Sequence, residues 1–132
     1  MALRIVQLGT PRAADEGLRL GTVRRPPRGV PKTEFASRDF YDLWLPTLAP
    51  SAELVKQAQS AISDGDAREW SRFVTRFRAE MKQPEASQLL DLLAALSHRT
   101  DLAIGCYCPD ESRCHRSVLR ELLDERGASI AG

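Results

Sequence analysis

The chain has 132 residues, the length of one domain, and its 42% hydrophobic and 28% charged content is close to the globular average. This composition excludes a chain that is disordered throughout, and the balance of 19 basic against 18 acidic residues excludes a protein that coats polyanions. No apolar run of about 18 residues is present, so we expect no transmembrane helix. The N-terminal segment, interrupted by Arg4, is too short for a signal peptide. We therefore expect a single domain over residues 1–132, located in the cytoplasm and without membrane contact.

The basic residues gather near the N-terminus, where residues 1–32 carry seven of them against two acidic residues. Sixteen of the 19 basic residues are arginine, whose planar guanidinium can hold a phosphate or carboxylate group by two hydrogen bonds. Arg24, Arg25 and Arg28 alternate with two prolines and a glycine, which turn and stiffen the backbone. This pattern predicts an anion-binding loop, with a solvated loop as the alternative.

The first third of the chain predicts short strands and loops. Residues 3–8 alternate weakly, carry β-branched side chains and stop at a Gly-Thr-Pro sequence, which is typical of a strand. Residues 18–23 alternate apolar and polar side chains and predict a second short strand. Residues 24–34 form the loop rich in proline and arginine, and the aromatic segment that follows predicts a short helix across residues 38–45.

Three helices are expected in the middle of the chain. Ser51 is a favourable N-cap for the first helix, which ends at an Asp-Gly sequence. Asp66 and Glu69 resemble a capping box for the second helix, in which aromatic residues recur every three or four positions. Pro84 can occupy the first turn of the third helix, which is rich in leucine.

The C-terminal part predicts a strand, a turn and a helix. Residues 102–108 are apolar enough for a buried strand, residues 109–112 form a polar turn, and residues 117–126 form a helix that ends at Gly127. The order of these elements predicts a small layered α/β fold. Its sheet has three or more mainly parallel strands, and it carries a helical middle section and a C-terminal strand-turn-helix.

The densest cluster of reactive side chains lies in this strand-turn-helix. If the last helix begins near Ser112, Cys114 lies in its first turn, where the helix dipole and neighbouring arginines lower the pKa of a thiol. In α/β proteins, this junction at the carboxyl end of a strand is also where ligands bind. The candidate catalytic residues are Cys114, Cys108 and His115. The candidate anion-binding residues are Arg24, Arg25, Arg28, Arg113 and Arg116.

Strand geometry indicates which of the other two cysteines lies nearer to Cys114. Side chains alternate along a strand, so Cys106 and Cys108 face the same side, and Cys108 at the strand end is the better placed to meet Cys114. A disulfide scaffold is not expected, because the cysteine count is odd and the expected compartment is reducing.

Zinc is an alternative that we do not adopt, with Cys106, Cys108, Cys114 and His115 as the available ligands. Against it, no Cys-x2–4-Cys spacing is present, and adjacent residues on a helix point about 100° apart. A purely structural role for the cysteines is the remaining alternative. No cofactor is therefore predicted.

These residues predict a small α/β protein with a site for a small phosphate- or carboxylate-bearing molecule or nucleotide, and the cysteines are consistent with a thiol-dependent enzyme. The alternatives are a module that binds nucleic acid or protein without catalysis, and a zinc protein. The sequence does not indicate a substrate or an oligomeric state.

The sequence resembles the bacterial domain of unknown function 488 family. The resemblance is carried by the Arg113-Cys114-His115-Arg116 signature after Cys106-Tyr107-Cys108, by the basic loop around residues 24–29, and by residues 45–51. Many members have Trp-Pro-Arg-Gly in the basic loop, whereas this chain has Pro26-Pro27-Arg28-Gly29 and no tryptophan there. The resemblance implies a small α/β fold and no established activity.

Overall fold

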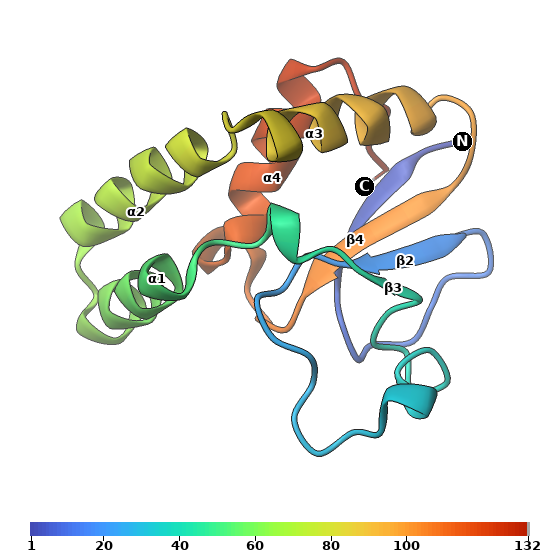
Figure 1. Ribbon diagram of the computed structural model, residues 1–132, viewed down its shortest axis with the longest axis horizontal. Coiled ribbons are helices and arrows are strands. Elements are labelled where there is room, and N and C mark those ends of the chain that lie inside the picture. Colours follow the sequence, from blue (N-terminus) through green and yellow to red (C-terminus); the bar gives the residue numbers. More distant parts are fainter. Residues whose placement is uncertain (132) are drawn as a thin grey trace.

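A computed structural model describes residues 1–131, in which four parallel strands form one sheet (Figure 1). The strands lie in the order β1-β4-β2-β3, so that β4 has a neighbour on each side. All five residues of β4 are buried, as expected for a central strand of a covered parallel sheet. The predicted small α/β fold with mainly parallel strands is confirmed. The strands are β1 (Leu3–Gln7), β2 (Leu18–Gly21), β3 (Leu43–Trp44) and β4 (Leu102–Cys106).

Four α-helices accompany the sheet, three of them in the middle of the chain and one near its C-terminus. Aromatic side chains of the second helix join leucines of the third and fourth helices and Ile104 of β4 in the main hydrophobic core. Phe73 and Phe77 are almost fully buried and their rings stack, with centroids 5.8 Å apart. The helices are α1 (Ala52–Asp64), α2 (Ala67–Glu80), α3 (Pro84–Leu96) and α4 (His115–Glu125).

The predicted helix boundaries in the middle of the chain are confirmed by their caps. Ser51 Oγ accepts a hydrogen bond from the backbone N–H of Leu54 at the start of α1, and Gly65 ends this helix with φ +65°. Asp66 caps α2 by accepting from two backbone N–H groups of the first turn. Pro84 occupies the first turn of α3.

The helix predicted across residues 38–45 is wrong, because this segment forms turns followed by strand β3. The backbone N–H of Asp42 donates to the Arg19 carbonyl at 2.8 Å, which starts the pairing of this segment with β2. The buried Tyr41 ring covers Gly21 so closely that a Cβ atom on the glycine would lie 2.3 Å from Tyr41 Cδ2. A long-range contact with β2 therefore outweighs the local preference for a helix.

The carboxyl ends of the strands point toward α1 and toward the start of α4 (Figure 1). The strands are shorter than predicted, since β2 ends at Gly21 and β4 ends at Cys106. Segments 22–31 and 107–114 begin at the carboxyl ends of β2 and β4, on the side of the sheet toward α1 (Figure 1). Among residues 1–131, no helix combines the length and the apolar character that crossing a bilayer requires.

Candidate functional site

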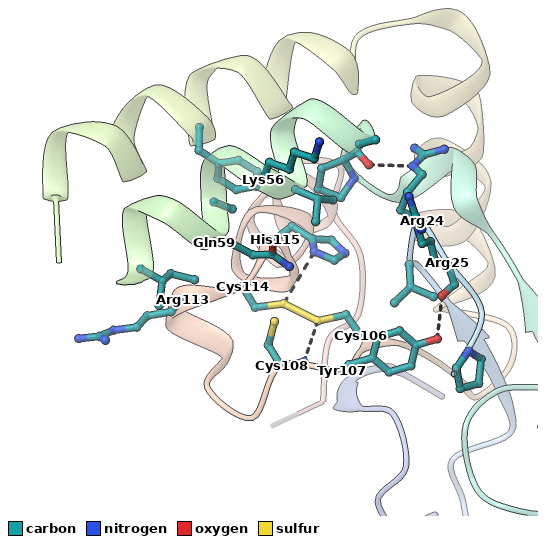
Figure 2. A pocket seen from close by; sticks show the side chains of 18 of the residues that line it. Arg24, Arg25, Lys56, Gln59, Cys106, Tyr107, Cys108, Arg113, Cys114 and His115 are labelled. Carbon is teal, nitrogen blue, oxygen red and sulfur yellow. Dashed lines mark hydrogen bonds between the residues drawn. A yellow bond between two sulfur atoms is a disulfide. The ribbon is translucent and has the colours of Figure 1, made fainter. Parts of the chain in front are cut away.

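A cavity of about 800 Å³ lies at the carboxyl ends of β2 and β4 (Figure 2). Helix α1 forms one wall, the loop at residues 23–28 forms a second, and residues 106–115 form the third. The structure thus brings the proline- and arginine-rich loop and the cysteine-containing segment to one site. The side chains that line the cavity include Arg25, Arg28, Lys56, Cys106, Cys114 and His115.

The basic loop is attached to both of the other walls. The Tyr107 hydroxyl donates a hydrogen bond to the Arg25 carbonyl at 2.8 Å, which ties the loop to the segment that follows β4 (Figure 2). Arg24 Nε donates to the Pro50 carbonyl at 2.9 Å, and its Nη2 donates to the carbonyls of Pro46 and Ala49. These bonds hold the loop against the start of α1, so the cavity walls are fixed relative to one another.

The charge of the cavity lining is of one sign. Five basic residues line the cavity, and within the described part of the chain no aspartate or glutamate does so. Arg25, Arg28 and Lys56 are exposed, and over residues 1–131 none of them has a carboxylate oxygen within 4.0 Å. A concave site lined by one sign of charge concentrates ligands of the opposite sign. The cavity is therefore electropositive.

The other predicted anion-binding arginines have different positions. Arg24 uses its guanidinium to bind backbone carbonyls, as described above, and Arg113 lies at the rim with its guanidinium directed away from the cysteine sulfurs (Figure 2). Arg116 is buried outside the cavity lining, and its Nη2 donates to the Cys108 carbonyl at 2.6 Å. Burial lowers the pKa of Arg116. Of the five arginines predicted for this site, Arg25 and Arg28 are thus the two that line the cavity with guanidinium groups unpaired within residues 1–131.

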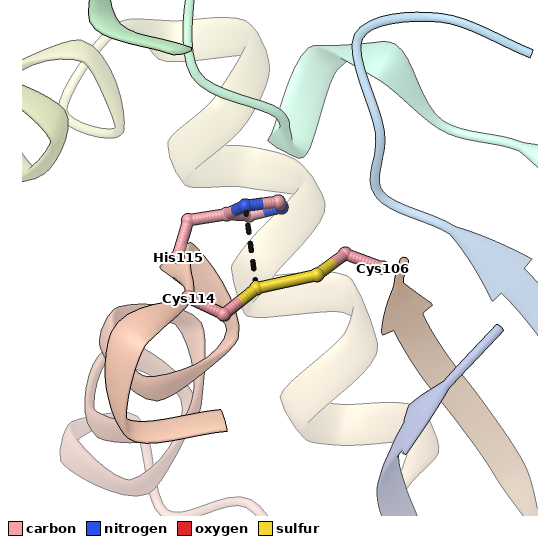
Figure 3. A group of neighbouring side chains, drawn as sticks. All are labelled: Cys106, Cys114 and His115. Carbon is pink, nitrogen blue, oxygen red and sulfur yellow. Dashed lines mark hydrogen bonds between the residues drawn. A yellow bond between two sulfur atoms is a disulfide. The ribbon is translucent and has the colours of Figure 1, made fainter. Parts of the chain in front are cut away.

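Two buried cysteines lie at the floor of the cavity and form a disulfide between the end of β4 and the start of α4 (Figure 3). The partner of Cys114 is Cys106, so the prediction that Cys108 meets Cys114 and that no disulfide forms is wrong. The reason is the length of β4: the strand ends at Cys106, and Cys108 already lies in the turn that follows. Cys108 is free and half-buried, and burial raises the pKa of its thiol.

A helix start near Ser112 would have placed Cys114 in the first turn of the last helix, and this prediction is wrong. Cys114 is instead the N-cap of α4. Its backbone is extended, with φ −135° and ψ 150°, and α4 begins at His115. An extended residue directs its side chain differently from a helical one, so the angle of about 100° between adjacent helical residues does not apply here. As a result, Cys114 Sγ and His115 Nδ1 converge to 3.8 Å.

The orientation of the His115 ring is fixed on both sides. Its Nε2 lies 2.6 Å from the Thr22 carbonyl, which can only accept, so Nε2 carries the proton and Nδ1 presents a lone pair. The ring lies beside Cys114 Sγ, to which Nδ1 is directed (Figure 3). The ring also meets Phe77 edge to face, with centroids 5.7 Å apart. Burial and the nearby charge of Arg116 lower the pKa of His115 to about 4, against the effect of the Thr22 bond. His115 is therefore a neutral imidazole at pH 7.

Sequence reasoning found the two segments of the site and missed two of its side chains. Cys106 was considered only as a ligand in the zinc alternative, although it follows Leu102 and Ile104 at every second position and is buried with Cys114 in a second hydrophobic cluster. Lys56 lies on an exposed face of α1, and nothing in the sequence distinguishes it from a solvated lysine.

The fold and the site define a small parallel α/β protein with an electropositive cavity over a cysteine–histidine cluster. The chain matches the family model described as the active DUF488-N3 subclade over residues 3–127, and it therefore belongs to the DUF488 family. No curated protein and no solved structure gives a significant match.

Proposed function

We propose that this protein binds a small phosphate- or carboxylate-bearing molecule in the cavity and is a thiol-dependent enzyme acting on it. The observation that carries the proposal is the lining, which has five basic side chains and, over residues 1–131, no acidic one. Arginine favours planar anionic groups because its guanidinium can donate two parallel hydrogen bonds to them. Arg25, Arg28 and Lys56 are the residues proposed to hold the anionic group.

The loop that carries the two arginines is suited to binding because it is ordered before the ligand arrives. Pro26 and Pro27 restrict its backbone, and the bonds from Tyr107 and Arg24 fix it to the other walls. A loop that is already ordered loses less conformational entropy on binding, which favours affinity.

The rest of the lining suits the organic part of such a ligand. Val55, Ala58 and Ile62 of α1 give an apolar wall, and Phe40 and Tyr107 supply aromatic rings. A volume of about 800 Å³ lies in the range of sites for small molecules and nucleotides. A ligand with an anionic group at the basic loop and a planar apolar part against α1 fits this distribution.

Cys114 is the proposed reactive thiol once the disulfide is reduced. A neutral His115 with its lone pair at Nδ1 can accept the thiol hydrogen of Cys114, from which it lies 3.8 Å. Cys108 is a weaker candidate, because it lies outside the cluster of Cys106, Cys114 and His115 whose reactive atoms are within 4.8 Å of one another, and burial also raises the pKa of its thiol. The description of the matched subclade as active supports an enzyme rather than a passive binding module.

Nucleic acid is the alternative partner, and the charge distribution favours a small ligand over it. Most arginines outside the cavity are engaged in ion pairs, such as Arg120 with Glu111 at 2.6 Å and Arg78 with Glu121 at 2.8 Å, and the exposed exceptions among the described residues are Arg68, Arg76 and Arg99. Arg25, Arg28 and Lys56 line the cavity and have no such partners within residues 1–131. They lie around a concave site rather than along an extended surface.

The experiment is a calorimetric titration of the reduced protein with AMP, with adenosine as the uncharged comparison. We expect AMP to bind, adenosine to bind at least about tenfold more weakly, and AMP affinity to fall as salt is added. Arg28→Ala and Lys56→Ala should each weaken AMP binding by about tenfold, whereas Arg99→Ala, an exposed arginine outside the cavity lining, should leave it unchanged. Equal binding of AMP and adenosine, or equal effects of the three substitutions, would contradict an anion site at this loop.

A further inference from the structure

We infer that reduced Cys106, reduced Cys114 and His115 form a zinc site whose fourth coordination position opens into the cavity. The zinc site shares Cys114 and His115 with the proposed thiol chemistry, but it does not rest on Arg25, Arg28 and Lys56, which are proposed to bind the anion. Soft thiolates and imidazole are the ligands that zinc prefers in proteins, and two cysteines with one histidine are a set that catalytic zinc sites use.

The ligand atoms already have the spacing that one ion requires. The two sulfurs and a ring nitrogen of His115 all lie within 4.8 Å of one another, and Nδ1 is 3.8 Å from Cys114 Sγ (Figure 3). With zinc at about 2.3 Å from sulfur and about 2.0 Å from nitrogen, the ligand atoms of a tetrahedral site lie roughly 3.5–3.8 Å apart. Small side-chain movements are therefore enough to close the three atoms around an ion.

The backbone separation of the two cysteines also suits an ion between them. Their Cα atoms lie 7.9 Å apart, whereas disulfides usually join Cα atoms about 4.4–6.8 Å apart. A zinc ion adds two metal–sulfur bonds between the side chains and spans the longer separation without drawing β4 and α4 together. The same positions can thus carry a disulfide when oxidised and a metal when reduced.

Hydrogen bonds around the cluster orient its ligands. Histidines that bind metals commonly donate their other ring N–H to a carbonyl group, and His115 Nε2 has this bond to Thr22. The backbone N–H of Cys108 points at Cys106 Sγ at 3.4 Å, which stabilises a thiolate at that sulfur. Phe77 packs against the imidazole and restricts its rotation. The ligands are therefore held in place by groups that do not bind the metal themselves.

The charge of the bound zinc and its open fourth coordination position both follow from the three ligands. Two thiolates neutralise one Zn²⁺, and binding releases two protons to solvent, one from each thiol. The three ligands all line the cavity, and Cys108 lies outside the group whose ligand atoms are within 4.8 Å. The fourth position is thus left for water or for an anionic group held at the basic loop, which a zinc ion would polarise as a Lewis acid.

The test is titration of the full chain with Zn²⁺ after reduction by a phosphine, which supplies the two electrons that open the disulfide. Competition with a chromophoric chelator should show one zinc per chain and two protons released, and the unreduced chain should bind none. Cobalt in place of zinc should give thiolate-to-metal charge-transfer absorption and the visible bands of a tetrahedral ion. These readouts on the unsubstituted chain do not depend on any variant being folded.

Variants locate the site. Cys106→Ser, Cys114→Ser and His115→Gln should each weaken zinc binding by at least about tenfold, with circular dichroism to check the fold. Cys108→Ser is the matched control and should bind zinc as the unsubstituted chain does. Absence of stoichiometric zinc and cobalt binding by the reduced chain would overturn the site. Loss of binding in Cys108→Ser would overturn the open fourth position. AMP binding without zinc binding would support the proposed anion site and overturn the zinc site. Zinc binding without AMP binding would support the zinc site and overturn the proposed anion site.

Discussion

The buried ion pair between Glu16 and Arg19 gives the sharpest prediction about what holds β2 against the neighbouring loops. Arg19 is fully buried, and its guanidinium meets the Glu16 carboxylate with Nε–Oε2 and Nη2–Oε1 distances of 2.7 and 2.8 Å. Its Nη1 donates to the carbonyls of Thr10 and Asp39 at 2.8 and 2.6 Å. Glu16→Gln keeps the shape of the side chain and removes its charge, which leaves the guanidinium buried without its counter-charge.

Breaking a buried pair in this way costs about 3–5 kcal/mol. For a chain of this length, an unfolding entropy of roughly 2.1 cal/mol/K per residue converts this loss to a fall in Tm of about 10–18 °C. The assay is urea unfolding of Glu16→Gln and the unsubstituted chain, followed by circular dichroism. The matched control is Glu121→Gln, whose partner Arg78 is part of an exposed pair and whose loss should cost no more than about 1 kcal/mol.

The pH dependence gives a second readout of the same pair. Burial raises the pKa of Glu16, but the hydrogen bonds and charge of Arg19 outweigh it, and the net pKa is lowered from the ordinary value of 4.5. A lowered pKa in the folded state contributes stability above the unfolded value, and this contribution is lost as pH falls through the folded value. The difference in free energy of unfolding between the unsubstituted chain and Glu16→Gln should therefore be constant at neutral pH and shrink below about pH 4.5. A difference under about 1 kcal/mol at pH 7, or one that does not change in acid, would refute the reasoning.

Two further substitutions test packing and hydrogen bonding. Gly21→Ala places a Cβ atom 2.3 Å from Tyr41 Cδ2, and the overpacking should lower the free energy of unfolding by about 1–3 kcal/mol; an unchanged urea midpoint would contradict the close approach. Ser97 Oγ is buried, donates to a carbonyl at 2.6 Å and accepts from the Ser129 N–H at 2.8 Å. Ser97→Ala should therefore cost about 1–3 kcal/mol in the same assay, against no measurable change for the exposed Ser60→Ala; equal effects of the two would contradict this role.

The sequence predicted best those features that depend on neighbouring residues. The N-caps at Ser51 and Asp66 and the proline at the start of α3 satisfy backbone groups within a few residues, so local chemistry was enough to place them. Segment 38–45 could not be assigned in this way, because its conformation depends on the packing of Tyr41 against Gly21, which lies in a strand about 20 residues earlier in the chain.

The candidate site shows the same division between local and long-range information. A parallel sheet brings the carboxyl ends of its strands to the same end of the sheet, which is why the basic loop after β2 and the cysteine segment after β4 lie together. The choice of Cys106 over Cys108 as the partner of Cys114 depends on where β4 ends and on the extended backbone of Cys114. A shift of one or two residues at an element boundary changes the direction of a side chain, and sequence patterns do not fix boundaries that finely.

The central claim is that the basic loop and the cysteine–histidine cluster form one site for an anionic ligand. A crystal structure of the reduced protein grown with AMP tests it most directly. We expect the phosphate group within hydrogen-bond distance of Arg25, Arg28 or Lys56, above the sulfurs of the cavity floor. A cavity without AMP in crystals where the nucleotide binds elsewhere on the chain would contradict it.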